Sequence, residues 1–341
     1  MVLPEGTSQN EFKICQMRAL VTGSTGFIGA GLVKQLAESG IHVNALYRSE
    51  NKAKSLKVRN VTLCKGDILD IESLRTAVKH CDHVYHVAAF TEVWAKDKDI
   101  IRRLNVEGTR NVLDVALENG IRDIVFTSTA GVLGPSISGI INENTDRSID
   151  YFLEYERTKA EAEELVSQYV KKGLNIKIVN PTRVYGPGFL GKSNSVTIMI
   201  KSYCEGKWHI IPGNGKSIGN YVYVDDVING HILAMELGKS GERYLLGGEN
   251  IDYLGFFNTL KKISGMNTWL IKVPLFAMLL ISGFAMFLNK LFGISPFITP
   301  ALVKKFNYNW EVSSRKAQKE LDYNITSFSD GMKKTLEWIK E

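Results

Sequence analysis

Short apolar runs alternate with longer amphipathic stretches over the first half of the chain. Between the first two runs, residues 30–39 show helical periodicity, with apolar Leu32, Val33 and Leu36 on one face. Such alternation, which continues to about residue 180, predicts an α/β fold with a doubly wound parallel sheet. The runs expected to form strands are Arg18–Thr22, His42–Tyr47, Val61–Lys65, His83–Val87, Asp123–Phe126 and Asn175–Val179.

The second half of the chain has a less regular pattern, with short helices and glycine-rich loops. Residues 321–340 are expected to end the chain as one helix, with Phe328, Met332, Leu336 and Ile339 on a single apolar face.

Residues 273–288 form an almost entirely apolar segment, with Gly283 near its middle and Lys290 just beyond it. Three interpretations are open: a buried or lid helix over a substrate pocket, a helix in contact with a membrane surface, and a spanning helix. A span needs about 20 residues, so the segment is short for one, and the buried or lid helix is favoured. The first two interpretations both predict an apolar substrate.

Three glycines follow the first apolar run directly, at Gly23, Gly26 and Gly29. A strand, a glycine turn and a helix together form the context of a dinucleotide-binding fingerprint. Gly23 permits the tight turn, Gly26 lets the backbone approach a pyrophosphate, and Gly29 lets the helix pack closely on the strand. The helix N-terminus offers amide groups and a positive dipole end to the phosphates. The other residues of this turn expected to contact the dinucleotide are Thr25, Phe27 and Ile28.

Tyr155 and Lys159 lie four residues apart in a run that is predicted to be helical. This spacing places a phenol and an amine on one face, about one turn apart. A phenol has a reference pKa of about 10, and a neighbouring ammonium lowers that pKa by stabilising the phenolate. Tyr155 is therefore a candidate proton donor, although such a pair by itself is more often a solvated helix face.

The glycine spacing together with this pair resembles the extended branch of the short-chain dehydrogenase/reductase superfamily, which includes NAD-dependent epimerases and dehydratases. The resemblance covers roughly residues 17–341 and implies a Rossmann-type fold. It implies a dinucleotide-binding domain at 17–185, to which parts of 210–250 return, and a smaller substrate lobe mainly at 186–341.

The resemblance also assigns expected roles within the site. Thr129 would be the hydroxyl that orients a substrate carbonyl, with Ser128 as the less favoured choice. Tyr155 would deliver the proton, and Lys159 would hold the ribose hydroxyls. Asn105 would relay protons or brace a helix. The further residues expected along the dinucleotide are Asp67, Ile68, Ala88, Ala89, Pro181, Thr182 and Val184.

The end of the second strand indicates which nicotinamide cofactor is used. An NAD-selective site places a carboxylate there to hold the ribose 2′-hydroxyl. This chain has Arg48 at that point, with Lys52 and Lys54 close behind and no carboxylate. A guanidinium suits a 2′-phosphate, so the sequence predicts a preference for NADP(H) over NAD(H).

Two positions distinguish between branches of the superfamily. Ala130 and Gly131 stand where dehydratases carry an Asp-Glu pair, and Gly219 stands where sugar-nucleotide epimerases commonly carry a diphosphate-binding arginine. The remaining segments resemble the dihydroflavonol 4-reductase and 3β-hydroxysteroid dehydrogenase-like branch. The favoured function is therefore NADPH-dependent reduction of a ketone or aldehyde. A sugar-nucleotide epimerase and a non-catalytic nucleotide-binding scaffold are the alternatives.

Composition limits the remaining classes of function. The 341 residues carry a net charge of +6 without a marked Lys/Arg run, so nucleic-acid binding is not expected. The cysteines, Cys15, Cys64, Cys81 and Cys204, have no metal-site spacing and are expected to be reduced thiols. Residues 1–16 lack the apolar core of a signal peptide and are expected to be a frayed leader. The expected location is the cytoplasm, with membrane attachment open through residues 273–288, and homodimerisation is common in the family that the chain resembles.

Overall fold

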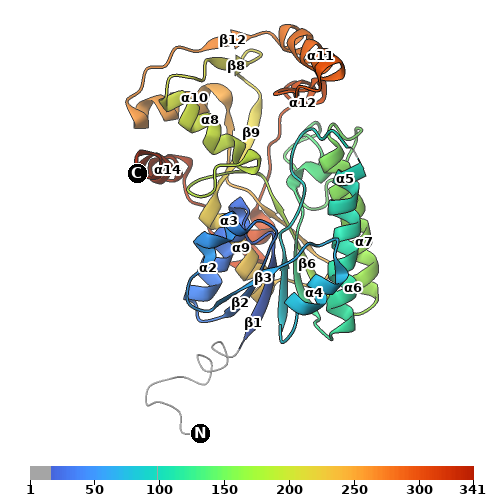
Figure 1. Ribbon diagram of the computed structural model, residues 1–341. Helices are drawn as coiled ribbons and strands as arrows, with labels where there is room; N and C mark the ends of the chain where they lie inside the picture. The colour runs from blue at the N-terminus through green and yellow to red at the C-terminus, as the bar shows by residue number, and fades with distance from the viewer. Residues whose placement is uncertain (1–16, 98) are drawn as a thin grey trace.

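Seven parallel strands form the central sheet of the protein, in the order β10-β6-β5-β4-β1-β2-β3 (Figure 1). The computed structural model describes residues 17–97 and 99–341. The strands of this sheet are β1 (Arg18–Thr22), β2 (His42–Tyr47), β3 (Val61–Lys65), β4 (His83–His86), β5 (Asp123–Thr127), β6 (Asn175–Pro181) and β10 (Arg243–Leu246).

The six strands expected from the sequence are all present, and the doubly wound parallel sheet is confirmed. The first three have the predicted bounds, and the next three end within two residues of them. The seventh strand, β10, was not predicted. It comes from the second half of the chain and pairs with β6, so the sheet is completed by residues far apart in sequence.

Helices cover both faces of this sheet. On one face, α2 (Phe27–Glu38), α9 (Val224–Leu237) and α13 (Arg315–Leu321) share an apolar core with β1, β2 and β10. On the other, α4 (Ile71–Ala77), α6 (Gly108–Glu118) and α7 (Glu154–Lys171) pack on β4, β5 and β6. The shorter helical segments are α3 (Glu50–Ala53), η1 (Lys54–Leu56), α5 (Asp99–Arg102), η2 (Arg103–Glu107), η3 (Ala130–Leu133) and η4 (Lys192–Asn194).

A second lobe lies beyond the carboxyl ends of the strands, at the top of Figure 1. Its three-stranded sheet consists of β7 (Arg183–Tyr185), β9 (Ile218–Tyr223) and β11 (Glu249–Asp252), and β8 (Ile210–Pro212) pairs with β12 (Ile271–Val273). Aromatic rings of Tyr221, Phe256 and Phe328 meet in its core. The helices of the lobe are α8 (Ser195–Cys204), α10 (Tyr253–Ser264), α11 (Leu275–Phe292), α12 (Pro300–Lys305) and α14 (Phe328–Lys340).

The final predicted helix begins later than the sequence indicated. Leu321 ends α13, and Asp322 then adopts a left-handed conformation with φ of 54°, which stops that helix. The last helix, α14, starts only at Phe328, after Ser327 has capped it by accepting a hydrogen bond from the Asp330 amide. The expected apolar face is confirmed, because Phe328, Met332 and Leu336 are buried.

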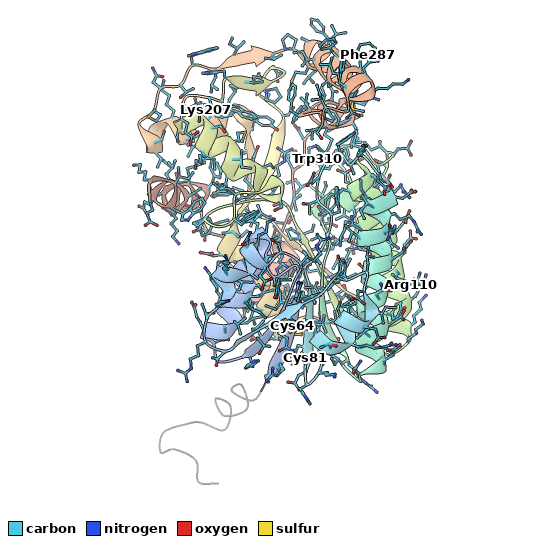
Figure 2. All side chains as sticks on the ribbon, viewed as in Figure 1. Cys64, Cys81, Arg110, Lys207, Phe287 and Trp310 are labelled. Atoms are coloured by element: carbon cyan, nitrogen blue, oxygen red, sulfur yellow. The ribbon has the colours of Figure 1, made fainter. Side chains whose placement is uncertain are left out.

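The favoured interpretation of residues 273–288 was a buried or lid helix; the buried form is wrong, and the lid form stays a prediction. These residues belong to α11, and Phe276, Leu280 and Phe284 on that helix are 69%, 71% and 62% exposed. Only Met278, Ser282 and Ala285 are buried in it. Figure 2 labels Phe287 on this helix, at the outer end of the second lobe. A helix that is apolar on all sides does not reveal in sequence which side is covered, and this explains the error.

By length and composition, α11 is the one helix among residues 17–97 and 99–341 that could cross a membrane. The cysteines that the structure describes, Cys64, Cys81 and Cys204, are free thiols, whereas Cys15 and the expected leader at 1–16 lie outside the described residues.

Candidate active site

A cavity of about 920 Å³ lies between the carboxyl ends of the strands and the second lobe. Loops after β1, β2, β3, β4 and β5 line one side of it, and residues of α8, α12 and β7 line the other. Ligand sites of open α/β sheets lie at this edge. The predicted site residues that line the cavity are Gly23, Thr25, Gly26, Phe27, Ile28, Gly29, Arg48, Asp67, Ile68, Ala88, Ala89, Thr129, Tyr155, Pro181, Thr182 and Val184. Lys159 does not line it.

The glycine turn forms a close-fitting cradle at one end of this cavity. Gly23 has φ of 67°, a conformation that favours glycine, and its carbonyl accepts a hydrogen bond from the Gly26 amide over 2.9 Å. A Cβ atom on Gly29 would lie 2.2 Å from the Gly23 oxygen, and one on Gly23 would lie 2.7 Å from the Ala88 nitrogen. Side chains are therefore excluded at both positions, and the residues at the start of α2 line the cavity.

Helix α7, which carries Tyr155 and Lys159, is fixed to its neighbours by a buried asparagine. The Asn105 side chain accepts a hydrogen bond from the Phe90 amide at 2.7 Å and donates to the Phe90 carbonyl and the Thr158 hydroxyl. Both N–H groups of Nδ2 therefore donate hydrogen bonds, and Oδ1 accepts one from a backbone amide. They favour the bracing role for Asn105 over a proton relay.

Tyr155 and Thr129 both line the cavity. Burial raises the pKa of Tyr155 to about 12, and a side-chain hydrogen bond with Thr129 acts in the opposite direction. Thr129 itself caps the short helix η3 by accepting a hydrogen bond from the Gly131 amide at 3.2 Å. The phenol and the hydroxyl that were expected to act together therefore do lie together.

The expected effect of Lys159 on the phenol is not found. The Lys159 Nζ is buried, has no hydrogen-bond partner, and lies 4.0 Å from the centre of the Phe126 ring. Burial lowers the pKa of this amine to about 7, although Glu163 opposes that shift. The spacing in sequence was right, but Lys159 lies one turn deeper, over β5, where the sheet excludes water from its amine.

Ser128, like Lys159, has a buried polar atom that lacks a hydrogen-bond partner. Its Oγ is buried without a hydrogen-bond partner, and the residue lines the cavity beside Thr127 and Thr129. The sequence ranked Ser128 below Thr129 as the functional hydroxyl. Buried hydroxyls are normally satisfied, so this unused group at the cavity wall also points to a ligand.

The cationic end of the cavity lies beyond β2. Arg48 contacts Asp67 in an exposed ion pair with 3.4 Å between Nη1 and Oδ2, and both residues line the cavity. Lys52 lies over the Phe189 ring at 4.5 Å. Exposed ion pairs hold their partners weakly, so the Arg48 guanidinium is available to an incoming anion.

Position 219 is a glycine, as expected from the sequence, but an arginine from another strand lies beside it. A Cβ atom on Gly219 would lie 2.5 Å from Nη1 of Arg183, so the guanidinium of Arg183 fills the space beside this glycine. Sequence reasoning missed this residue because Arg183 and Gly219 lie on different strands, β7 and β9. Its presence weakens the argument from Gly219 against an epimerase.

Tyr223 is the N-cap of α9, and Asp225 and Asp226 lie in the first turn of that helix. Asp226 accepts hydrogen bonds from the amide and hydroxyl of Thr326, which tie the chain before α14 to α9.

Residues 19–247 match the NAD dependent epimerase/dehydratase family. The chain belongs to this family. A putative dihydroflavonol 4-reductase of Synechocystis sp. is 30% identical over 329 residues, which cover 94% of each chain. Sterol demethylase protein B of Methylococcus capsulatus is 34% identical over 251 residues, which cover 73% of this chain and 75% of the relative.

A solved structure shares the fold of this family member along nearly its whole length. UDP-glucuronic acid 4-epimerase from Bacillus cereus, in complex with UDP-glucuronic acid and NAD, superposes with a TM-score of 0.77. The two chains are 26% identical, and the match covers 95% of this chain and 99% of that one. Together these likenesses make the protein an NAD(P)-dependent enzyme of the short-chain dehydrogenase/reductase type.

The residues of this chain fit a dinucleotide. A side chain at Gly23 or Gly29 would collide with neighbouring backbone, so this turn keeps the close glycine geometry of a pyrophosphate site. The Lys159 amine and the Ser128 hydroxyl, both buried and without partners, are groups that the hydroxyls of a bound ribose or substrate could satisfy. When bound, the nicotinamide supplies hydride chemistry, and the protein supplies position and electrostatics.

Replacing Lys159 by Met is expected to stabilise the dinucleotide-free protein, because the variant no longer buries an unpartnered amine. The pKa of Lys159 is lowered from 10.5 to about 7 in the folded state, so the unfolded chain binds more protons between these values. The wild type is therefore least stable below pH 7 and gains stability as the pH rises from about 7 towards 10.5. We expect Lys159→Met to raise the free energy of unfolding by about 1–3 kcal/mol at pH 6, with a smaller gain at pH 9.

Urea unfolding of both proteins at the two pH values measures this difference. Lys34→Met, a change to an exposed lysine on α2, serves as the matched control for loss of a lysine charge. A Lys159→Met variant that is less stable than wild type at pH 6 would contradict the assignment of an unsatisfied buried amine.

Proposed function

We propose that this protein is an NADPH-dependent reductase of a ketone or aldehyde on a largely apolar substrate, or the corresponding alcohol dehydrogenase in reverse. The observation that supports this most directly is the position of Tyr155 and Thr129. Both line the cavity that also contains the glycine cradle. A carbonyl oxygen in that cavity could accept the Tyr155 proton while Thr129 orients it, and a hydride could reach the same carbonyl from the nicotinamide.

In this proposal each residue has one task. Tyr155 is the general acid or base, and Thr129 stabilises charge that develops on the oxygen. Lys159 is assigned to the ribose hydroxyls, although its amine is buried and does not line the cavity, and Arg48 is assigned to a 2′-phosphate. The cofactor contacts include Pro181, Thr182 and Val184, which lie where β6 leads into β7.

The wall of the cavity supports an apolar substrate. On the side of the second lobe, many of the side chains that line it are aliphatic or aromatic, namely Phe189, Val196, Met199, Trp208, Leu302 and Phe306. Most of these side chains come from α8, α12 and the loops beside them. A surface of this kind binds apolar ligands and leaves orientation to a few polar groups.

Two other functions in the same family are less well supported. Dehydration would need an acid and a base after Thr129, but Ala130 and Gly131 stand there. Epimerisation remains the alternative, since the relative from Bacillus cereus binds UDP-glucuronic acid and Arg183 supplies a guanidinium beside position 219. A reductase consumes NADPH with a ketone or aldehyde panel, whereas an epimerase turns over without net consumption.

The exposed face of α11 supports attachment to an anionic membrane surface. Its large apolar side chains are joined by Trp269, which is 61% exposed on the approach to β12. Residues 253–310 contain six lysines and no Asp or Glu, so the segment around this face is basic. Apolar burial combined with attraction to anionic lipid is the usual basis of such binding. Because α11 packs on α12, which lines the cavity, the membrane would lie close to the substrate entrance.

Tyr155→Phe is expected to lower kcat by about 10²–10⁴-fold, because the variant keeps the ring but has no proton to give. Dinucleotide affinity should change by no more than about threefold, since only a hydroxyl is lost. Tyr151→Phe is the matched control, because Tyr151 is exposed and stacks on Arg147. A Tyr155→Phe protein that retains most of its kcat would refute the proposed role.

Arg48→Ala is expected to raise KM for NADPH by about tenfold or more and to change KM for NADH little, because only NADPH carries the 2′-phosphate. Steady-state kinetics with both cofactors provides the measurement. Arg59→Ala, an exposed arginine before β3, removes the same charge outside the cavity. Equal use of the two cofactors by the wild type would rule out the preference.

Flotation of the full chain with phosphatidylcholine vesicles, with or without phosphatidylglycerol, tests membrane attachment. We expect binding to the anionic vesicles, and the double change Phe284→Ser and Phe287→Ser should reduce that binding at least about tenfold. The control changes Val58→Ser and Leu117→Ser remove exposed apolar residues outside α11. Binding that survives the α11 changes, or equal absence of binding to both kinds of vesicle, would contradict the proposal.

A further inference from the structure

Arg183 is a cation inside the site whose charge is not balanced. It lines both the main cavity and an adjoining cavity of about 110 Å³ next to Tyr155 and Thr129. Nη1 donates hydrogen bonds to the hydroxyls of Tyr221 and Tyr253, at 3.1 and 3.3 Å. Among the residues that the structure describes, no carboxylate lies within ion-pair distance of this guanidinium. Arginines that are withdrawn from water are normally paired, so the lack of an acid is informative.

The surroundings of Arg183 fix the guanidinium in one place. Gly219 leaves the space that the group fills, since any side chain there would collide with Nη1 and Cζ. The guanidinium carbon lies 5.5 Å from the centre of the Tyr221 ring and 5.9 Å from that of Tyr253. Two hydroxyls and two aromatic rings therefore hold it from the side of the second lobe. Neither hydroxyl neutralises its charge.

The neighbouring charges add to this positive excess. Glu156 is the one carboxylate among the residues that line the smaller cavity, and it already binds both Arg147 and Lys305. The side chains of Arg147 and Glu156 are almost fully buried, and Lys305 also lines the cavity. Burial lowers the pKa of Lys305, the paired Glu156 opposes that shift, and the charges of Arg183 and Arg147 add to the lowering. Three cations, Arg183, Arg147 and Lys305, thus have one carboxylate among them at the smaller cavity.

We propose that Arg183 binds an anionic oxygen group of the substrate, a carboxylate or a phosphate, while the carbonyl of the same molecule lies at Tyr155. This assignment deepens the proposed reductase function and rests on it. A planar guanidinium held by two tyrosines presents its remaining N–H donors to such a group. The substrate is then amphipathic, with an apolar body along α8 and α12 and an anionic group at β7.

Two aldehydes of equal shape test this inference, para-carboxybenzaldehyde and its neutral amide para-carbamoylbenzaldehyde. Calorimetry on the full chain saturated with NADP⁺ measures binding alone, because the oxidised cofactor cannot reduce an aldehyde. The wild type should bind the carboxylate about 10- to 100-fold more tightly than the amide. Arg183→Gln should abolish this preference, and Arg183→Lys should restore part of it, since it keeps the charge without the fork.

Arg315→Gln serves as the control, since it removes an exposed cation outside both cavities. The thermal unfolding midpoint of each variant shows whether the fold is kept, and Tyr253→Phe provides a milder change that should weaken the preference without removing it. Equal binding of the two aldehydes by the wild type, including no binding of either, overturns the inference. So does a preference that persists in Arg183→Gln.

Turnover of the same aldehydes with NADPH separates this inference from the proposed function. Anion preference in binding without any NADPH consumption would leave the Arg183 assignment standing and remove the reductase. Reduction of both aldehydes with no preference for the carboxylate would support the reductase and overturn the Arg183 assignment. A second arm with para-formylphenyl phosphate distinguishes a phosphate from a carboxylate as the favoured group.

Discussion

The position of helix α7 against the sheet is the constraint on which the site depends. Asn105 on η2 holds it by bonding Thr158, and the apolar side chains of Ala162, Leu165 and Val166 pack it against β5 and β6. With α7 fixed in this way, Tyr155 at its first turn faces the cavity and Lys159 lies one turn deeper. Helix α7 therefore fixes the positions of both the Tyr155 phenol and the unpartnered Lys159 amine.

The electrostatics of the cavity point to anionic and hydroxyl-bearing ligands. Lys159 has no partner, Arg48 has only a weak exposed one, and Arg183 has no carboxylate. Arg48 and Arg183 line the cavity, whereas Lys159 lies buried over β5. Without a ligand the buried Lys159 amine costs the protein stability, because charge withdrawn from water is unfavourable unless it is paired. The ligand-free protein is therefore less stable than it would be with paired groups, and ligand binding supplies the missing partners.

The sequence was sufficient for those features that depend on local pattern. The six strands, the glycine cradle and the Tyr155–Lys159 pair follow from periodicity and spacing within short segments. It was insufficient where the answer depends on segments far apart in the chain. The pairing of β10 with β6, the guanidinium of Arg183 beside Gly219, and the exposed face of α11 are all set by tertiary contacts. The pKa of Tyr155 also depends on tertiary contacts. Burial raises this pKa, whereas the helical spacing to Lys159 was expected to lower it.

Tyr155, the proposed acid of this site, should become a usable proton donor only when a dinucleotide is bound. Spectrophotometric titration of the phenols, taken as the difference between wild type and Tyr155→Phe, isolates this residue from the other tyrosines. Without dinucleotide the pKa of Tyr155 should be about 12. With NADP⁺ bound we expect a decrease of at least about two pH units, as a phenolate gains charge stabilisation. An identical titration in the two states would contradict the account.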